Sequence, residues 1–120
     1  MSYAFELYPY LLDANTYSPH RCFRLAVGGA YGVQRVVPSA GADVDGVSGS
    51  GTNGAGGGLF ACPGLPVQVE ASAAFSSGAL LECLADGRVK QQAGGIGVLR
   101  ALESSAGSGS IVWACFTSGR

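Results

Sequence analysis

The stretch LADGRVKQQ, Leu84 to Gln92, carries the clearest local structural signal in the chain. Asp86-Gly87 is the dipeptide that most favours a tight two-residue hairpin turn, because both central positions of that turn need a positive φ. The apolar segment ALLECLA precedes the turn and RVKQQ follows it. The stretch therefore predicts a β-hairpin with Arg88 and Lys90 on the solvent face of the returning strand, and no reactive site.

Strand signals recur on both sides of this hairpin, separated by turns rich in glycine and serine. VQVEA, for example, places Val67, Val69 and Ala71 on one face and polar side chains on the other. No window of a dozen residues carries a helical apolar stripe free of Gly and Pro. The pattern predicts an all-β fold, a small antiparallel β-sandwich or barrel. The predicted strands are Arg21–Val27, Tyr31–Val37, Val67–Ala71, Ala79–Ala85, Arg88–Gln92, Ile96–Glu103 and Ile111–Phe116.

Two segments fall outside the strand pattern. In residues 41–58 eight of eighteen positions are glycine, which predicts a long flexible Gly-rich loop. Residues 1–20 hold four of the five tyrosines, and aromatic residues outside a core indicate an extended arm that binds a partner. The alternative is that FELYPYLL is one more strand of a single β-domain, which otherwise spans 21–120. The predicted arm contacts are Tyr3, Phe5, Tyr8, Tyr10 and Tyr17.

Composition excludes several classes of function. Only 12% of the 120 residues are charged, against roughly 25% in an ordinary soluble domain. A net charge of −1 with one lysine, Lys90, is not that of a nucleic-acid binder. No apolar run approaches the ~20 residues that span a bilayer, and the first residues lack signal-peptide features, so we expect synthesis in a cytoplasm. A neutral surface on so small a protein indicates that part of it is covered in an assembly.

The four cysteines, Cys22, Cys62, Cys83 and Cys115, form no CxxC pair. The spacing of a zinc knuckle is therefore missing. Each cysteine lies in an apolar stretch, which predicts four buried, reduced thiols. A disulfide formed after release from a reducing cell is the alternative.

Catalytic patterns are weak, and we predict no enzyme, no cofactor and no metal site. Gly49 to Gly54 spells GxGxxG, but no helix can start after it, as dinucleotide binding requires. His20 is the only histidine and lies in an exposed turn, where a catalytic base is not expected. Asp43 and Asp45 sit in a stretch too rich in glycine to preorganise a calcium site. Glu70 and Glu82 are expected on polar strand faces, exposed to water.

The second half of the chain resembles the small capsid decoration, or cement, proteins of tailed bacteriophages. The resemblance runs through PVQVEA, then ASAAFSSGALLECLADGRV, then GGIGVLRALESSAGSGSIVWACF. In that family a strand and a small-residue segment precede a hairpin with a DG tip, and a small-residue turn leads to a final apolar strand. The eighteen-residue Gly-rich segment and the long Tyr-rich arm depart from the family pattern.

The resemblance implies a structural virion protein, commonly a homotrimer, that binds the outer surface of the capsid. Its partners would be the major capsid protein and further copies of itself, with no nucleic acid and no membrane. One alternative is a phage receptor-binding or carbohydrate-binding β-module. That alternative needs displayed aromatic residues, whereas the Gly-rich loop has none and Trp113 is predicted in a core strand. A second alternative, a small trimeric nucleotide hydrolase, needs a pocket of acidic and basic residues that the scattered charges do not form.

Overall fold

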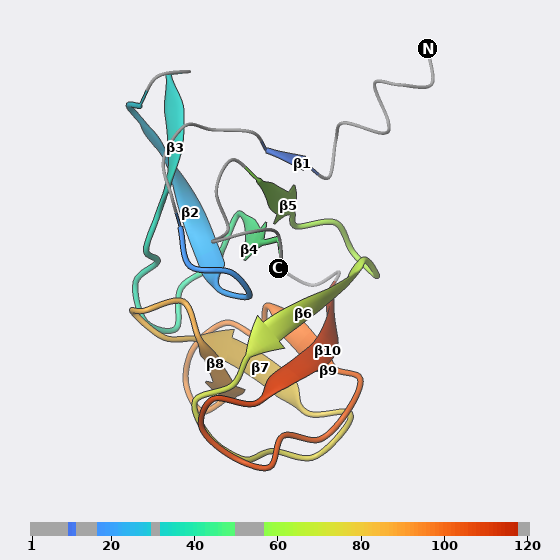
Figure 1. Cartoon of the computed structure of the whole chain (residues 1–120). Coiled ribbons are helices and arrows are strands. Elements are labelled where there is room, and N and C mark those ends of the chain that lie inside the picture. Colours follow the sequence, from blue (N-terminus) through green and yellow to red (C-terminus); the bar gives the residue numbers. More distant parts are fainter. Residues whose placement is uncertain (1–9, 12–16, 30–31, 50–56, 118–120) are drawn as a thin grey trace.

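The computed structural model describes residues 10–11, 17–29, 32–49 and 57–117. These residues form two five-stranded antiparallel sheets packed as a sandwich, the first of the two predicted architectures (Figure 1). The first sheet has the order β1-β5-β4-β2-β3 and the second the order β6-β10-β9-β7-β8. The strands are β1 (Tyr10–Leu11), β2 (Cys22–Val27), β3 (Val33–Val36), β4 (Gly46–Ser48), β5 (Gly58–Phe60), β6 (Pro66–Glu70), β7 (Leu80–Cys83), β8 (Val89–Gln91), β9 (Leu99–Ala101) and β10 (Ile111–Phe116).

The described part of the chain contains no helix, and so no helix that could cross a membrane. Apolar side chains from both sheets share one core. Cys22, Val44 and Val47 come from the first half of the chain and pack with side chains of β6, β7, β9 and β10. In the second sheet a parallel bridge joins Ala71 to Val89, so that the sheet curls and its two edge strands meet at one end.

Strand β6 follows the predicted alternation, with Val67, Val69 and Ala71 buried. The prediction of a strand over residues 96–103 is wrong in its length. Strand β9 begins only at Leu99, and its inward side chains are Leu99 and Ala101, while Leu102 is 49% exposed. The cause lies outside the strand: the chain before Leu99 forms loop contacts, including a backbone hydrogen bond from Ile96 to the Gly41 carbonyl.

The β7–β8 hairpin exists, but its turn differs from the predicted two-residue type. The Leu84 N–H donates to the Arg88 carbonyl and the Gly87 N–H to the Leu84 carbonyl. Of Asp86 and Gly87 only the glycine has a positive φ, 89°. This is a three-residue connection closed by a glycine in the left-handed region. The Asp86 carboxylate supports it by accepting the Arg88 backbone N–H at 3.0 Å.

The predicted flexible loop, residues 41–58, contains a strand of the first sheet. Strand β4 lies between β5 and β2, and all three of its residues are buried. Gly46 is needed there because a Cβ would collide with the Leu59 carbonyl and the Phe23 ring. Gly46 thus permits a close approach of two backbones, and the prediction of a flexible loop is wrong for residues 46–48. Residues 50–56, with most of the GxGxxG pattern, lie outside the described residues.

The four cysteines are free thiols, but only Cys22 and Cys83 are buried. Cys62 is exposed and Cys115 is intermediate, so the prediction of four buried thiols is wrong for these two. Cys62 lies in the turn that follows β5, and Cys115 is on the outward-facing alternation of β10. Apolar neighbours in sequence did not distinguish a turn or an outer face from the core.

Candidate interaction surface

The part of the predicted arm that the structure describes lies on its own domain. Tyr10 and Leu11 form β1 and pair with Leu59 and Gly58 of β5. Tyr17 packs edge-on against Phe23, with ring centroids 6.3 Å apart, and its hydroxyl donates to the Cys22 carbonyl at 2.6 Å.

Tyr17 is also held by charge and burial. The Arg35 guanidinium stands 5.7 Å from its ring centroid, a cation–π distance. Burial raises the pKa of the Tyr17 hydroxyl above its usual range, so the hydroxyl stays a hydrogen-bond donor. Tyr3, Phe5 and Tyr8 lie outside the described residues, and the contact of the arm with a partner stays a prediction.

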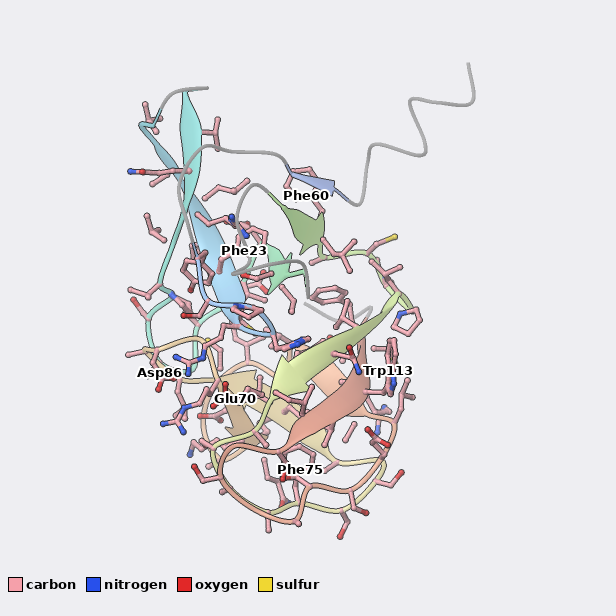
Figure 2. All side chains as sticks on the ribbon, in the orientation of Figure 1. Phe23, Phe60, Glu70, Phe75, Asp86 and Trp113 are labelled. Atoms are coloured by element: carbon pink, nitrogen blue, oxygen red, sulfur yellow. The ribbon has the colours of Figure 1, made fainter. Side chains whose placement is uncertain are left out.

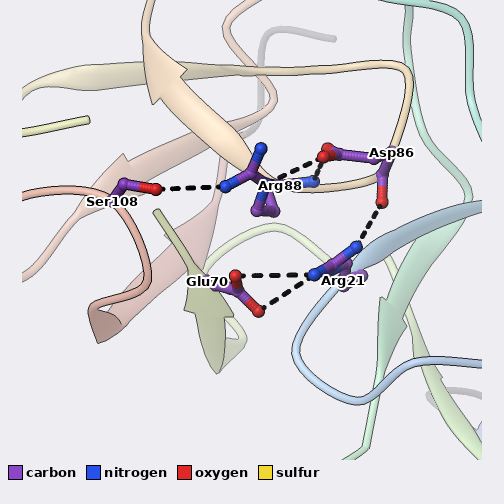
Figure 3. A network of polar contacts seen from close by, with 5 residues as sticks. All are labelled: Arg21, Glu70, Asp86, Arg88 and Ser108. Carbon is purple, nitrogen blue, oxygen red and sulfur yellow. Dashed lines mark hydrogen bonds and ion pairs between the residues drawn. The ribbon is translucent and has the colours of Figure 1, made fainter. Parts of the chain in front are cut away.

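The tip of the β7–β8 hairpin is a joint between the two sheets (Figure 3). Arg21, the residue before β2, donates to Glu70 of β6 at 3.3 Å and to the Asp86 carbonyl at 3.4 Å. Arg88 pairs with the Asp86 carboxylate at 2.8 Å and donates to Ser108. The Cys22 N–H donates to the Gly87 carbonyl at 2.8 Å. Asp86-Gly87-Arg88 is thus a structural connection.

The electrostatics of this joint favour the charged forms of its members. Partial burial raises the pKa of Asp86, but the hydrogen bonds and the charge of Arg88 outweigh burial and lower it overall. The Glu70 side chain is 22% exposed and engaged by Arg21. Its prediction as a water-facing carboxylate on a polar strand face misses this pairing, because the partner is distant in sequence.

The prediction for Glu82 is wrong, and by more than that for Glu70. It was expected to face water, but it is only 6% exposed. One carboxylate oxygen, Oε1, accepts backbone N–H groups from Ala93, Gly94 and Gly95 at 2.7, 3.1 and 2.8 Å. These hydrogen bonds lower the pKa of Glu82 to about 2, despite the opposing effect of burial. Lys90 Nζ lies 3.7 Å from the other oxygen. The loop after β8 thus folds over Glu82.

The aspartates of the Gly-rich segment also have structural partners. Asp45 accepts the Leu25 backbone N–H at 2.8 Å and Arg24 Nε at 3.1 Å. Asp43 accepts the Val44 N–H at 2.9 Å. Among the described residues no three His, Cys, Asp or Glu side chains gather into a group able to hold a metal ion.

The outer face of the second sheet carries exposed apolar side chains. Trp113 is 45% exposed, Ile111 42% and Leu102 49%. The alternate residues of β10, Val112, Ala114 and Phe116, are buried. The prediction that Trp113 belongs to the core is therefore wrong, and the indole lies at the surface beside β6 (Figure 2). A displayed tryptophan is a recurrent feature of binding surfaces.

Two hollows open on this sheet. The larger, about 500 Å³, lies near the ends of β7, β9 and β10, and Arg100 is its only charged lining residue among those described. The smaller, about 130 Å³, lies where β6 meets the first sheet and is bordered by Trp113. Neither is lined by a carboxylate within the described chain, so neither offers a described acid–base pair.

The fold and its surface define a small, weakly charged two-sheet β-module. No family model matches the chain, and no curated protein matches it. Among solved structures, the chain is similar to the N base of the head fiber protein gp8.5 of bacteriophage phi29. The superposition has a TM-score of 0.68 and covers 90% of this chain and 91% of that chain, at 14% sequence identity. The two proteins share a fold over nearly their whole compared lengths.

Proposed function

We propose that the chain is a structural protein of a phage head, a capsid decoration or cement protein on the outer surface of the virion. The observation that carries this proposal is the fold shared with the phi29 head fiber base over 90% of the chain. The superposition covers 90% of this chain and 91% of that one, so the likeness extends over nearly the whole of both. The proposed partners are the major capsid protein and further copies of this chain.

The surface chemistry supports a mechanical role. Charged residues make up only 12% of the chain, and the Arg21–Glu70 ion pair links the two sheets, while Arg88–Asp86 holds the hairpin tip. Hydrogen bonds or ion pairs within the domain engage four of the described carboxylates: Asp45, Glu70, Glu82 and Asp86. A non-enzymatic binding module needs this kind of rigid frame more than it needs titratable groups.

The N-terminal arm supplies the proposed grip on the capsid. Strand β1 lies at the edge of the first sheet, and Tyr3, Phe5 and Tyr8 precede it in sequence. In a homotrimer, three such grips on one rigid lattice would add through effective concentration, so that each contact can be weak while the assembly scarcely dissociates. Binding to the assembled lattice alone would stabilise it by mass action.

Co-sedimentation with mature and with immature empty capsids tests the proposal. We expect the full chain to pellet with mature capsids, and a variant lacking residues 1–9 to fold but stay in the supernatant. That deletion keeps β1 and Tyr17, which belong to the domain. Gln91→Ala, an exposed polar change on β8 and away from the arm, is the control and should pellet normally. If the full chain pellets with neither form of the capsid, the proposal fails.

A further inference from the structure

The outer face of the second sheet has an apolar patch at its centre. Ile111 and Trp113 point outward from β10, and the Leu102 N–H donates to the Trp113 carbonyl at 2.9 Å, so Leu102 lies next to Trp113. All three side chains are exposed, and we call them the outer patch. Single exposed apolar residues are ordinary on a protein surface, whereas adjoining ones mark a place where another molecule packs.

Polar side chains surround the outer patch on the neighbouring strands. Gln68 of β6 is paired with Trp113. Arg100 of β9 is paired with Cys115, the next outward-facing residue of β10. Glu103 lies beside the patch, since its Oε1 accepts the Trp113 N–H at 2.9 Å. An apolar centre with an aromatic anchor and a polar rim is the usual arrangement of a protein–protein interface.

Two charges of this rim, those of Arg100 and Glu103, take part in no ion pair within the described chain. Arg100 donates to the Gly78 carbonyl at 2.8 Å, and Glu103 accepts the Trp113 N–H. Other basic side chains of the described chain pair with carboxylates, as do Arg21, Arg24, Arg88 and Lys90. A cation and an anion left on one face fit a partner that presents the opposite charges in matching places. A wholly acidic or wholly basic partner would match one of them and repel the other.

A second copy of this chain presents both charges in the required arrangement. When two copies pack about a two-fold axis, residue i of each contacts residue j of the other. Two points on a face are exchanged by the two-fold axis that lies in the face and bisects the line between them. For Arg100 and Glu103 this axis crosses the chain just before Leu102. Trp113 lies across from Leu102 on β10, so the axis runs close to both apolar side chains.

We propose that the outer patch is a contact between two copies of this chain, related by a two-fold axis beside Trp113. The two indoles pack together at the axis, where an aromatic pair adds to the effect of the apolar area buried. Arg100 of each copy faces Glu103 of the other, which makes two ion pairs. This two-fold contact is distinct from a three-fold contact within a homotrimer, and one assembly can contain both. Its formation involves no capsid, so its test is independent of the proposed function.

Sedimentation equilibrium of the full-length protein, from about 10 μM to about 1 mM, measures the association. We expect the mean mass to rise with concentration from 12.1 kDa toward twice that value. Trp113 is the only tryptophan, so a blue shift of its emission over the same range reports burial of the outer patch. Trp113→Ala should weaken the association about tenfold or more, as the loss of a central aromatic anchor predicts.

Charge exchange tests the geometry of the pair. Arg100→Glu and Glu103→Arg should each associate about tenfold more weakly than the wild type, because each places like charges opposite one another at two points. An equal mixture of the two variants restores opposite charges at both points, so it should associate within about threefold of the wild type. Val27→Glu adds a charge to a 93% exposed side chain of β2, on the other sheet, and should associate like the wild type.

Four results would overturn the proposal. The first two concern the wild type: its mass stays at 12.1 kDa throughout the range, or it tends to three times that value, which a two-fold contact cannot produce. The third is normal association of Trp113→Ala. The fourth is a mixture of Arg100→Glu with Glu103→Arg that associates no better than either variant alone.

Discussion

Glu82→Gln should destabilise the protein because Glu82 is a buried carboxylate held by three backbone donors. Its pKa falls from 4.5 to about 2 on folding, a shift that corresponds to roughly 3 kcal/mol at 1.36 kcal/mol per pKa unit. Ala93 and Gly94 are exposed, so water replaces part of what their N–H groups lose. We therefore expect a loss of about 2 kcal/mol at pH 7, or about 8–10 °C in Tm.

The pH dependence identifies the charge as the cause. A carboxylate whose pKa is lowered on folding contributes its full stability above the unfolded pKa of 4.5, and that stability is lost as the pH falls toward about 2. Urea unfolding followed by far-UV circular dichroism at pH 7 and pH 2.5 measures both limits. The difference between wild type and Glu82→Gln should shrink sharply at pH 2.5.

Glu103→Gln is the matched control for Glu82→Gln. Glu103 is exposed and accepts a single backbone N–H, that of Trp113 at 2.9 Å, so its loss should cost less than about 0.5 kcal/mol. An equal loss for Glu82→Gln at both pH values would show that packing, and not the ionised carboxylate, sets the effect. A loss no larger than that of Glu103→Gln at pH 7 would refute the reasoning altogether.

Three further perturbations test the fold. Gly87→Ala should lower the free energy of unfolding in urea by about 2 kcal/mol or more, because the new Cβ would lie 2.7 Å from the Cys22 carbonyl oxygen. Gly64 has a similar φ but lies in open space, so Gly64→Ala should lower it by only about 1 kcal/mol. Equal losses would contradict the contact between Gly87 and Cys22. Cys62 should react at once with Ellman's reagent in the native protein, and an unreactive native protein would place this thiol in the interior. Tyr17→Phe should lower the free energy of unfolding by about 1 kcal/mol in the same assay, because it removes the hydrogen bond to the Cys22 carbonyl. An unchanged urea midpoint would show that Tyr17 does not stabilise the domain through this bond.

The sequence predicts the second sheet well because its strands are specified locally. Val67 and Val69 are buried as their alternation predicts, and the Ile111–Phe116 segment forms a strand where one was expected, although Trp113 faces outward. The β7–β8 hairpin is predicted from the Asp86-Gly87 dipeptide at its tip. Each of these features depends on residues that are near neighbours in the chain, where alternation and turn chemistry are informative.

The first sheet and the burial of Glu82 depend on contacts between residues that are distant in the sequence. Strand β4 is hidden in a glycine run, because Gly46 is selected by the Leu59 backbone across the sheet. Glu82 is buried by a loop that returns eleven residues later, at Ala93. Trp113 was misplaced for another reason: both faces of IVWACF are apolar, so alternation separates two sets of side chains without saying which one faces the core.

The seam between the sheets brings together two unfavourable features: His20 has a φ of 62°, and the buried Ser48 Oγ has no hydrogen-bond partner among the described residues. His20 must turn sharply so that its N–H meets Ser48 of the first sheet while its carbonyl meets Glu70 of the second. The same turn places Arg21 within hydrogen-bond distance of Glu70 and of the Asp86 carbonyl, and these hydrogen bonds join the sheets. The joint therefore fixes the Ser48 backbone at the wall of the hollow, independently of what its side chain bonds. The unpaired Ser48 Oγ is therefore a cost of joining the sheets, because its burial is imposed by these backbone contacts.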